Sequence, residues 1–287
     1  TVEDLRRIPI TTRATLQSLP AHDVVAAGSD PSRFCTHTTS GSSGRPLTIR
    51  RSWVEERLLI EIRLRAMRAY GLAGSDTVAL IKTPAHGDNR GLLMRLVQLV
   101  RPDRWHLIDC ALEPAEIAAR IRALGPAVVV GYPGVLARVA QVVDPAKLRM
   151  PGLRFVTTGG EVLAPSQRAQ IADAFGTLVY DTYGSFEFDL LAWECPTADG
   201  YHVADDGIVL EVLRDGRPVA EGECGEVVGT ALHSYAMPFI RFALGDVVRR
   251  GPAACSCGQP FSTIGEIHGR VVDCFRLPDG RVVHPYA

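Results

Sequence analysis

The sequence lacks the features that mark several classes of protein. No apolar run reaches the roughly 18 residues that a helix needs to cross a bilayer, and no signal-peptide pattern opens the chain. The formal net charge is −1, so no basic surface argues for nucleic acid or for an anionic membrane. The seven cysteines are an odd number at irregular spacing, which argues against a disulfide framework. We therefore expect a cytoplasmic protein that binds neither nucleic acid nor membrane.

Three common catalytic or nucleotide-binding signatures are also missing. A Walker A loop would need Gly-Lys-Ser/Thr after its glycine-rich run, and a dinucleotide-binding fold would need Gly-x-Gly-x-x-Gly. The Gly-x-Ser-x-Gly elbow of many serine hydrolases is absent as well. Any phosphate binding in this chain must therefore use a different loop.

The middle of the chain alternates strand-like and helix-like runs. Strands are expected over 77–81, 105–109, 127–130, 153–157 and 178–181, and helices over 91–100, 114–124, 134–143 and 166–175. The run 127–130 is apolar at every position, as in a strand covered on both faces. A further helix is expected after Ser52, which can cap its start, and Gly71 can end it. This alternation predicts an α/β fold with parallel sheets flanked by helices.

The alternation of strand-like and helix-like runs ends after residue 193. Short β-like runs at 208–213, 225–230, 239–242 and 247–250 are separated by Gly, Asp and Pro, which indicates a smaller, mostly antiparallel β subdomain. We expect an α/β core over 1–193 and the β-rich subdomain of the same large domain over 194–273. Residues 274–287 would be the start of a following part.

The segment from Thr38 to Pro46 is rich in hydroxyl groups and glycine. Its glycines allow positive-φ backbone and its hydroxyls supply donors, so the loop can wrap an anion. The alternative is a flexible Gly/Ser linker. However, a probable strand at 47–50 and a helix follow at once, which favours phosphate binding.

Further motifs occur in a fixed order after this loop. Thr157 to Glu161 and Asp181 to Glu187 each end an expected strand, where open α/β sheets bind ligands. Arg241 to Asp246 and Gly269 to Asp273 follow. In this order the motifs resemble the adenylate-forming superfamily of acyl-CoA synthetases, peptide-synthetase adenylation domains and luciferases. Three other segments are similar to its phenylacetate–CoA ligase branch: Leu5 to Thr12, Ala236 to Phe242, and Arg45-Pro46 without a following lysine.

The resemblance, which spans nearly the whole chain, implies the large N-terminal domain of an ATP-dependent acid–thiol ligase. Such enzymes join a carboxylate to the α-phosphate of ATP, release pyrophosphate, and pass the acyl group to CoA or another thiol. An aromatic or arylacetic acid is the expected substrate. Two alternatives stay open: an acyl carrier protein, amine or nitrogen oxyanion as acceptor, or a catalytically silent nucleotide-binding module.

The resemblance also implies roles for single residues. Glu187 would hold Mg²⁺ through a hard carboxylate oxygen, Arg270 would pair with phosphate or ribose, and both would act in catalysis. Asp246 would accept hydrogen bonds from the ribose hydroxyls, and Tyr183 would stack on adenine. The β- and γ-phosphates would be surrounded by Thr39, Ser40, Gly41, Ser42, Ser43 and Gly44, and the base would be lined by Gly159, Gly160 and Glu161. Without the resemblance, three alternatives stay open. Glu187 is then a surface carboxylate, Tyr183 is a buried core residue, and Asp246 lies in a turn.

In such enzymes the acid lies between the strands that end here near residues 83 and 131, which places His86 and Tyr132 as candidate substrate contacts.

Four residues of the β-rich part form a candidate metal site. Cys195, His202, Cys255 and Cys257 are the soft and borderline ligands of a closed structural zinc site. The alternative is scattered buried thiols and one surface histidine. Relatives that carry cysteines in matching places favour zinc.

By the same resemblance, a small C-terminal domain that assists adenylation and thiol transfer follows the Gly-Arg-x-x-Asp motif. It is missing from this chain, which should therefore bind ATP and acid but catalyse poorly.

Overall fold

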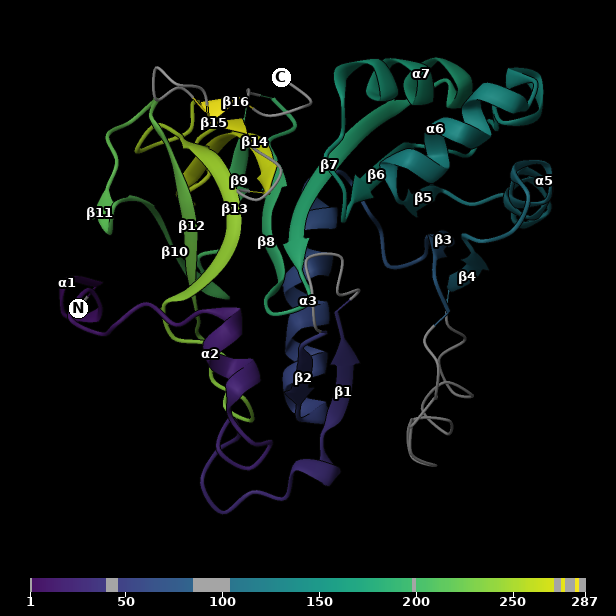
Figure 1. Cartoon of the computed structure of the whole chain (residues 1–287). Helices are drawn as coiled ribbons and strands as arrows, with labels where there is room; N and C mark the ends of the chain where they lie inside the picture. Colours follow the sequence, from purple (N-terminus) through teal and green to yellow (C-terminus); the bar gives the residue numbers. More distant parts are fainter. Residues whose placement is uncertain are drawn as a thin grey trace. The chain divides into compact units, whose positions relative to one another are not determined.

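A computed structural model describes residues 2–39, 46–84, 104–197, 200–270, 275–276 and 282–283. The chain forms two compact units (Figure 1). Unit 1 contains Thr1–Ala66 and Tyr183–Ala287, and unit 2 contains Met67–Thr182. These units divide the chain at other positions than the expected ranges 1–193, 194–273 and 274–287, which stay a prediction. The helix expected over 91–100 lies outside the described residues.

Unit 2 is built on a parallel sheet, as the alternating pattern predicts. Its strands run in the order β4-β3-β5-β6-β7, and all four neighbouring pairs are parallel. Their bounds are β3 Val78–Lys82, β4 Trp105–Asp109, β5 Val128–Gly131, β6 Phe155–Gly159 and β7 Leu178–Ser185. The last three residues of β7 belong to unit 1. The carboxyl ends of these strands carry the motifs that follow β6 and β7.

Three helices connect these strands and pack against the sheet (Figure 1). They are α5 Pro114–Leu124, α6 Pro133–Val142 and α7 Pro165–Phe175, with a short helical turn η2 at Pro145–Lys147. Each α-helix begins with proline, whose fixed φ suits the first helical position. Gly125 and Gly176 end α5 and α7 in the left-handed conformation. The helices bury Ile121, Leu136 and Phe175 against strand residues such as Ile81 and Val129.

A second cluster covers the other face of the same sheet. Met67 packs there with Val78, Val128 and Phe155. Tyr70 stacks on Tyr180 with ring centroids 4.1 Å apart. Both faces are therefore covered, which explains why β5 is apolar at every position.

Unit 1 contains an antiparallel sheet in the order β8-β9-β14-β13-β12-β10-β11. Its strands are β8 Asp189–Glu194, β9 Tyr201–Val203, β10 Ile208–Arg214, β11 Arg217–Pro218, β12 Cys224–Ala231, β13 Phe242–Arg250 and β14 Thr263–Arg270. The expected antiparallel β-rich part is thus present. A further pair, β15 Phe275–Arg276 and β16 Val282–Val283, is also antiparallel.

The N-terminal part of unit 1 supplies helices and a hairpin. Its elements are α1 Val2–Leu5, α2 Arg13–Ser18, η1 Pro31–Arg33, β1 Cys35–Thr38, β2 Thr48–Arg51 and α3 Trp53–Ala69. Ser52 caps α3 as predicted, because its hydroxyl accepts the backbone N–H of Glu55 at 3.3 Å, while the Glu55 carboxylate accepts the N–H of Ser52. After α3, Gly71 takes a positive φ of 95°.

One expected strand is wrong. Residues 239–241 form no strand, and β13 begins only at Phe242. Arg241 breaks the strand with a φ of +46°, while its buried guanidinium binds both carboxylate oxygens of Glu211 at 2.9 and 3.2 Å. The same guanidinium donates to the carbonyls of Arg6 and Ile8 at 3.0 and 2.7 Å. This fastens residues 6–8 to the start of β13.

Within the described ranges, every helix is too short or too polar to span a lipid bilayer.

Candidate functional site

Three predicted residues of unit 1 meet at one buried carboxylate. Asp246 on β13 lies opposite Arg270 on β14 in the strand register. Its Oδ1 is 3.0 Å from Nε of Arg270, and its Oδ2 accepts the hydroxyl of Tyr183 at 2.7 Å. Asp246 is 7% exposed and Tyr183 is 8% exposed. Asp246 is therefore no surface turn residue but an oriented carboxylate with two donors.

Burial dominates the electrostatics of this group. Burial raises the pKa of Asp246, although the nearby Arg270 guanidinium opposes the rise. The pKa of Tyr183 is held well above its usual value by burial and by the adjacent Asp246 carboxylate. Tyr183 therefore stays a hydrogen-bond donor throughout the physiological range.

Glu187 is held by a residue that the sequence did not reveal. It is buried, and its Oε1 accepts a hydrogen bond from Arg13 at 3.0 Å. The same guanidinium donates to Oγ1 of Thr39 at 3.1 Å. Thr39 Oγ1 also accepts the backbone N–H of Leu47 at 3.0 Å, which closes the base of the hydroxyl-rich loop. Arg13 thus joins Thr39, the first of the predicted phosphate-binding residues, to the candidate magnesium ligand.

A second buried arginine ties the β1–β2 hairpin to the same motif. Arg51 donates to the carbonyl of Phe186 and lies 3.4 Å from the Glu56 carboxylate. Glu56 also bonds His37 at 2.6 Å. Burial opposes ionisation of Glu56, but the His37 and Arg51 contacts outweigh it and lower the pKa of this carboxyl.

Two carboxylates, the candidate magnesium ligand Glu187 and the candidate ribose ligand Asp246, belong to one electrostatic group. The charges of Glu187 and Arg13 both act on the titration of Asp246. Unit 1 joins Thr39, Arg13 and Glu187 in one set of contacts and Tyr183, Asp246 and Arg270 in another, and the nucleotide roles of these residues stay a prediction. The remaining loop residues, Ser40, Gly41, Ser42, Ser43 and Gly44, lie outside the described residues.

Unit 2 holds the other predicted nucleotide residues at the carboxyl end of its sheet. Gly159 ends β6, and Gly160 follows with a φ of +83°. A Cβ at Gly160 would lie 3.0 Å from the Tyr132 ring, so glycine is needed there for space as well as for backbone. Glu161 accepts the backbone N–H of Gly134 at 2.9 Å. These contacts gather Gly159, Gly160, Glu161 and Tyr132 at neighbouring strand ends.

Tyr132 is the described candidate for contact with a substrate. It precedes α6, and burial and the neighbouring Cys110 raise the pKa of its phenol. Thr83 lies beside Cys110, with 3.4 Å between its Oγ1 and the Cys110 sulfur. The ends of β3, β4 and β5 thus meet around this phenol. The other candidate, His86, lies outside the described residues.

The four predicted metal ligands come together in unit 1. Their ligand atoms all lie within 4.8 Å of one another. The sulfurs of Cys195 and Cys255 are 3.8 Å apart, and the sulfur of Cys257 is 3.3 Å from Nε2 of His202. Tetrahedral zinc with Zn–S bonds of about 2.3 Å separates two sulfurs by about 3.8 Å. The donor set and its spacing therefore fit zinc.

Aromatic rings and an arginine pack around this group of ligands, which we call the Cys3His cluster. His202 is fully buried and packs on Trp193 with ring centroids 5.4 Å apart. The guanidinium of Arg65 lies between the rings of Trp193 and Phe261, at 4.3 and 4.4 Å from their centroids. The backbone N–H of Gln259 points to the Cys257 sulfur at 3.5 Å. These contacts position His202 and Cys257 within the cluster.

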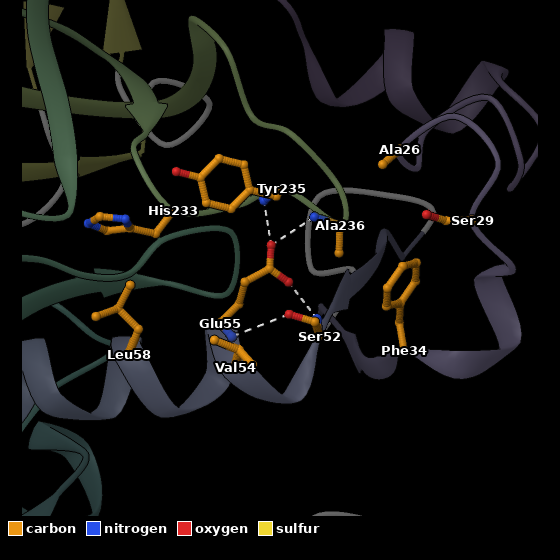
Figure 2. Close-up of a pocket in the computed structure, with 10 residues that line it drawn as sticks. All are labelled: Ala26, Ser29, Phe34, Ser52, Val54, Glu55, Leu58, His233, Tyr235 and Ala236. Carbon is orange, nitrogen blue, oxygen red and sulfur yellow. Dashed lines mark hydrogen bonds between the residues drawn. The ribbon is translucent and has the colours of Figure 1, made fainter.

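A separate cavity of about 410 Å³ lies elsewhere in unit 1 (Figure 2). Val54 and Leu58 of α3 line it, which explains why these two helix residues are exposed rather than packed. The Glu55 carboxylate in its wall accepts backbone N–H groups of Tyr235, Ala236 and Ser52. The carboxylate is thus occupied by backbone donors, and the cavity wall is mainly carbon.

Comparison with curated proteins finds phenylacetate–coenzyme A ligases, whereas no protein-family model matches the chain. The ligase of Thermus thermophilus is 25% identical over 308 residues, which cover 95% of this chain and 62% of that protein. The Escherichia coli ligase is 26% identical over 267 residues, covering 88% and 59%. The chain thus spans about six-tenths of the length of these relatives.

Solved structures agree on the fold. A crystal structure of 2-hydroxyisobutyryl-CoA ligase in the postadenylation state has a TM-score of 0.80 and 23% identity, covering all of this chain and 63% of that one. An anthranilate-CoA ligase structure has a TM-score of 0.64 and 17% identity, covering 91% and 51%. The resemblance predicted from the motifs is confirmed: in sequence this chain is similar to the phenylacetate–CoA ligase branch, and it has the fold of the adenylate-forming enzymes.

Proposed function

We propose that the protein activates a carboxylic acid with ATP. A carboxylate oxygen bonds to the α-phosphorus, the bond from that phosphorus to the bridging oxygen breaks, and pyrophosphate leaves. The acyl group then passes from AMP to the thiol of CoA or of another acceptor. The observation that carries this proposal is the joined group of Glu187, Asp246, Arg13 and Arg270 in a chain with this fold. Relatives named as phenylacetate–CoA ligases support an aromatic or arylacetic acid as substrate.

The nucleotide roles follow from the chemistry of the side chains. Asp246 is fixed by Tyr183 and Arg270, and each of its oxygens has a second lone pair for a ribose hydroxyl. Arg270 is partly exposed and can turn to a phosphate oxygen. The Tyr183 hydroxyl would hold Asp246, the carboxylate that would bind the ribose, and the Tyr183 ring would stack on adenine. Ser40 to Gly44 would supply the remaining donors around the phosphates.

Glu187 fits Mg²⁺ because a hard carboxylate oxygen is what this ion prefers. The ion would neutralise charge that develops on the phosphates. Glu187 would orient it from a buried position that Arg13 already holds.

The acid would lie near Tyr132 and His86. Tyr132 presents a phenol at the ends of three parallel strands, in an arrangement that suits stacking against an aromatic acid. We also propose a cytoplasmic location, because the thiols of the described residues are free.

A structural zinc ion in the Cys3His cluster is the second part of this proposal. Four protein ligands leave no position for water, so the ion would hold the fold rather than act on substrate.

Calorimetric binding and isotope exchange test the function together. The chain should bind Mg-ATP and an acyl-sulfamoyl adenosine that mimics the adenylate, and each ligand should raise the melting temperature by mass action. A carboxylic-acid screen by ATP–pyrophosphate exchange, on the natural full-length protein, should find an aromatic acid that stimulates exchange. Binding without exchange for any acid would favour a silent nucleotide-binding module. Exchange without CoA thioester would favour a carrier protein or an amine as acceptor.

Asp246→Asn should separate stability from binding. Because burial raises the pKa of Asp246, its ionisation costs folding free energy above its folded-state pKa. The neutral amide avoids this cost, so the variant should melt at a higher temperature than wild type at pH 8. Its affinity for ATP and for AMP should fall about tenfold or more, since both ligands carry the ribose.

The gain in melting temperature should vanish as the pH falls through the folded-state pKa toward about 4, where wild-type Asp246 is protonated as well. Melting curves from pH 4 to pH 8 measure this. A variant that is less stable than wild type at pH 8 and keeps full affinity for AMP would contradict the role given to Asp246.

A further inference from the structure

Arg13 occupies the point where three parts of the nucleotide site meet. Its guanidinium bonds Oγ1 of Thr39 at 3.1 Å and Oε1 of Glu187 at 3.0 Å, and its charge also acts on Asp246. The Arg13 side chain is 24% exposed, whereas that of Glu187 is 5% exposed. The arginine therefore reaches from the rim of the group to a buried carboxylate.

The backbone around Arg13 is anchored to the strand that carries Asp246. Thr11 forms a bridge with Phe242 at the start of β13. Its carbonyl accepts the N–H of Ala243 at 2.9 Å, and its own N–H donates to the carbonyl of Arg241 at 2.9 Å. The Thr12 hydroxyl then caps α2 by accepting the N–H of Thr15 at 3.2 Å. Arg13, the first residue of α2, is thus placed by fixed backbone on both sides.

The charges of this group balance when no nucleotide is bound. Arg13 and Arg270 face Glu187 and Asp246, so two cations meet two anions. A nucleoside triphosphate adds several negative charges and a divalent cation. If Glu187 binds the cation, the guanidinium of Arg13 is released beside the first residue of the phosphate loop. Its planar fork of donors matches phosphate oxygens.

We propose that Arg13 binds the β- and γ-phosphates of the nucleotide, exchanging the Glu187 carboxylate for phosphate oxygens when Mg-ATP enters. The inference rests on the proposed function and adds a residue to it. In the ligand-free protein the Arg13–Glu187 pair keeps both groups compensated and in position. On release of pyrophosphate the guanidinium returns to Glu187. Arg13 would therefore distinguish a triphosphate from a monophosphate.

Calorimetric titration with Mg-ATP and with AMP tests the proposal. Arg13→Gln should weaken Mg-ATP binding about 30-fold, the scale of a charge-assisted hydrogen bond, and leave AMP binding within about threefold of wild type. Arg13→Lys keeps the charge without the fork and should lose about 3- to 10-fold for Mg-ATP. Arg57→Gln is the matched control, because Arg57 forms an exposed ion pair with Glu61, and it should bind both ligands like wild type.

The outcomes separate this proposal from the function on which it rests. Equal losses for Mg-ATP and AMP, or no loss for either, would overturn the role of Arg13 while leaving the nucleotide site intact. If the wild-type chain binds neither Mg-ATP nor AMP, the proposed function itself is overturned. If Arg13→Gln does not fold, Arg13→Gln/Glu187→Gln removes both charges of the pair and is compared with Glu187→Gln alone. A further loss of Mg-ATP affinity in the double variant supports the proposal, and equal affinities refute it.

Discussion

Loss of the Cys3His cluster should lower the melting temperature of the protein by about 10 °C or more. Structural zinc contributes several kcal/mol to folding, and apparent values of about 10–16 kcal/mol are known for zinc-finger peptides. A loss of 1 kcal/mol lowers the melting temperature of a domain this large by roughly 2–4 °C. Cys255→Ser/Cys257→Ser should therefore melt far below wild type. Elemental analysis of the purified protein should find one zinc ion per chain.

The effect is large because the cluster joins segments that are far apart in the sequence. Cys195 follows β8, His202 lies in β9, and Cys255 and Cys257 precede β14. Cys35→Ser is the control, since Cys35 lies outside the cluster in β1, and it should keep both its zinc and its melting temperature. Metal-free wild-type protein that melts like the zinc-loaded protein would show that the four residues are only packed together.

Glu187→Gln should lower the rate of ATP–pyrophosphate exchange by the protein about 100- to 1,000-fold. The amide keeps a carbonyl oxygen for Arg13 but removes the negative charge that would hold the metal. Loss of one preorganised electrostatic group at a reacting centre commonly costs about 3–4 kcal/mol in the transition state. Exchange of labelled pyrophosphate at saturating acid measures the rate.

Glu61→Gln provides the same substitution on an exposed surface pair and should leave the exchange rate unchanged. AMP affinity should also survive in Glu187→Gln, because AMP lacks the phosphates that share the metal. An exchange rate within threefold of wild type would remove Glu187 from the site. Glu187 would also be removed from the site if Glu187→Gln lost as much affinity for AMP as for Mg-ATP.

The sequence predicted the α/β part of the fold closely, because its signals are local. The bounds of β4 and α5 match the expected ranges, since apolar runs, an initial proline and a glycine stop all lie within the elements or directly beside them. The strand predicted over 239–242 is wrong because the contacts that shape this run come from distant parts of the sequence. Its pattern suits a strand, but Arg241 is turned by contacts with Glu211, Arg6 and Ile8, which lie at least 30 positions away.

The candidate site shows the same limit. Asp246, Arg270 and Tyr183 could be named because their motifs resemble those of a known superfamily. Arg13 was not predicted, because the branch-like segment Leu5 to Thr12 ends directly before it and no pattern separates it from the other arginines of the chain. The bridge between Thr11 and Phe242, together with the hydrogen bonds from Arg241 to residues 6 and 8, places it beside Glu187. Which charged residues pair with each other thus depends on contacts between distant segments, and hydrophobic periodicity does not predict these contacts.

The fastening of residues 6–13 onto β13 has a consequence for how the protein is made. Arg13 and Glu187 are 174 positions apart, and Arg6 and Arg241 are 235 positions apart. The ribosome synthesises Arg6 and Arg13 long before residues 241–243, so the contacts that fasten residues 6–13 cannot form until the strand at 242–250 has been synthesised. Contacts of such separation also slow folding, because a long loop must close before they form. A nascent chain in which residues 6–13 have not yet met β13 therefore lacks the contacts that position Arg13.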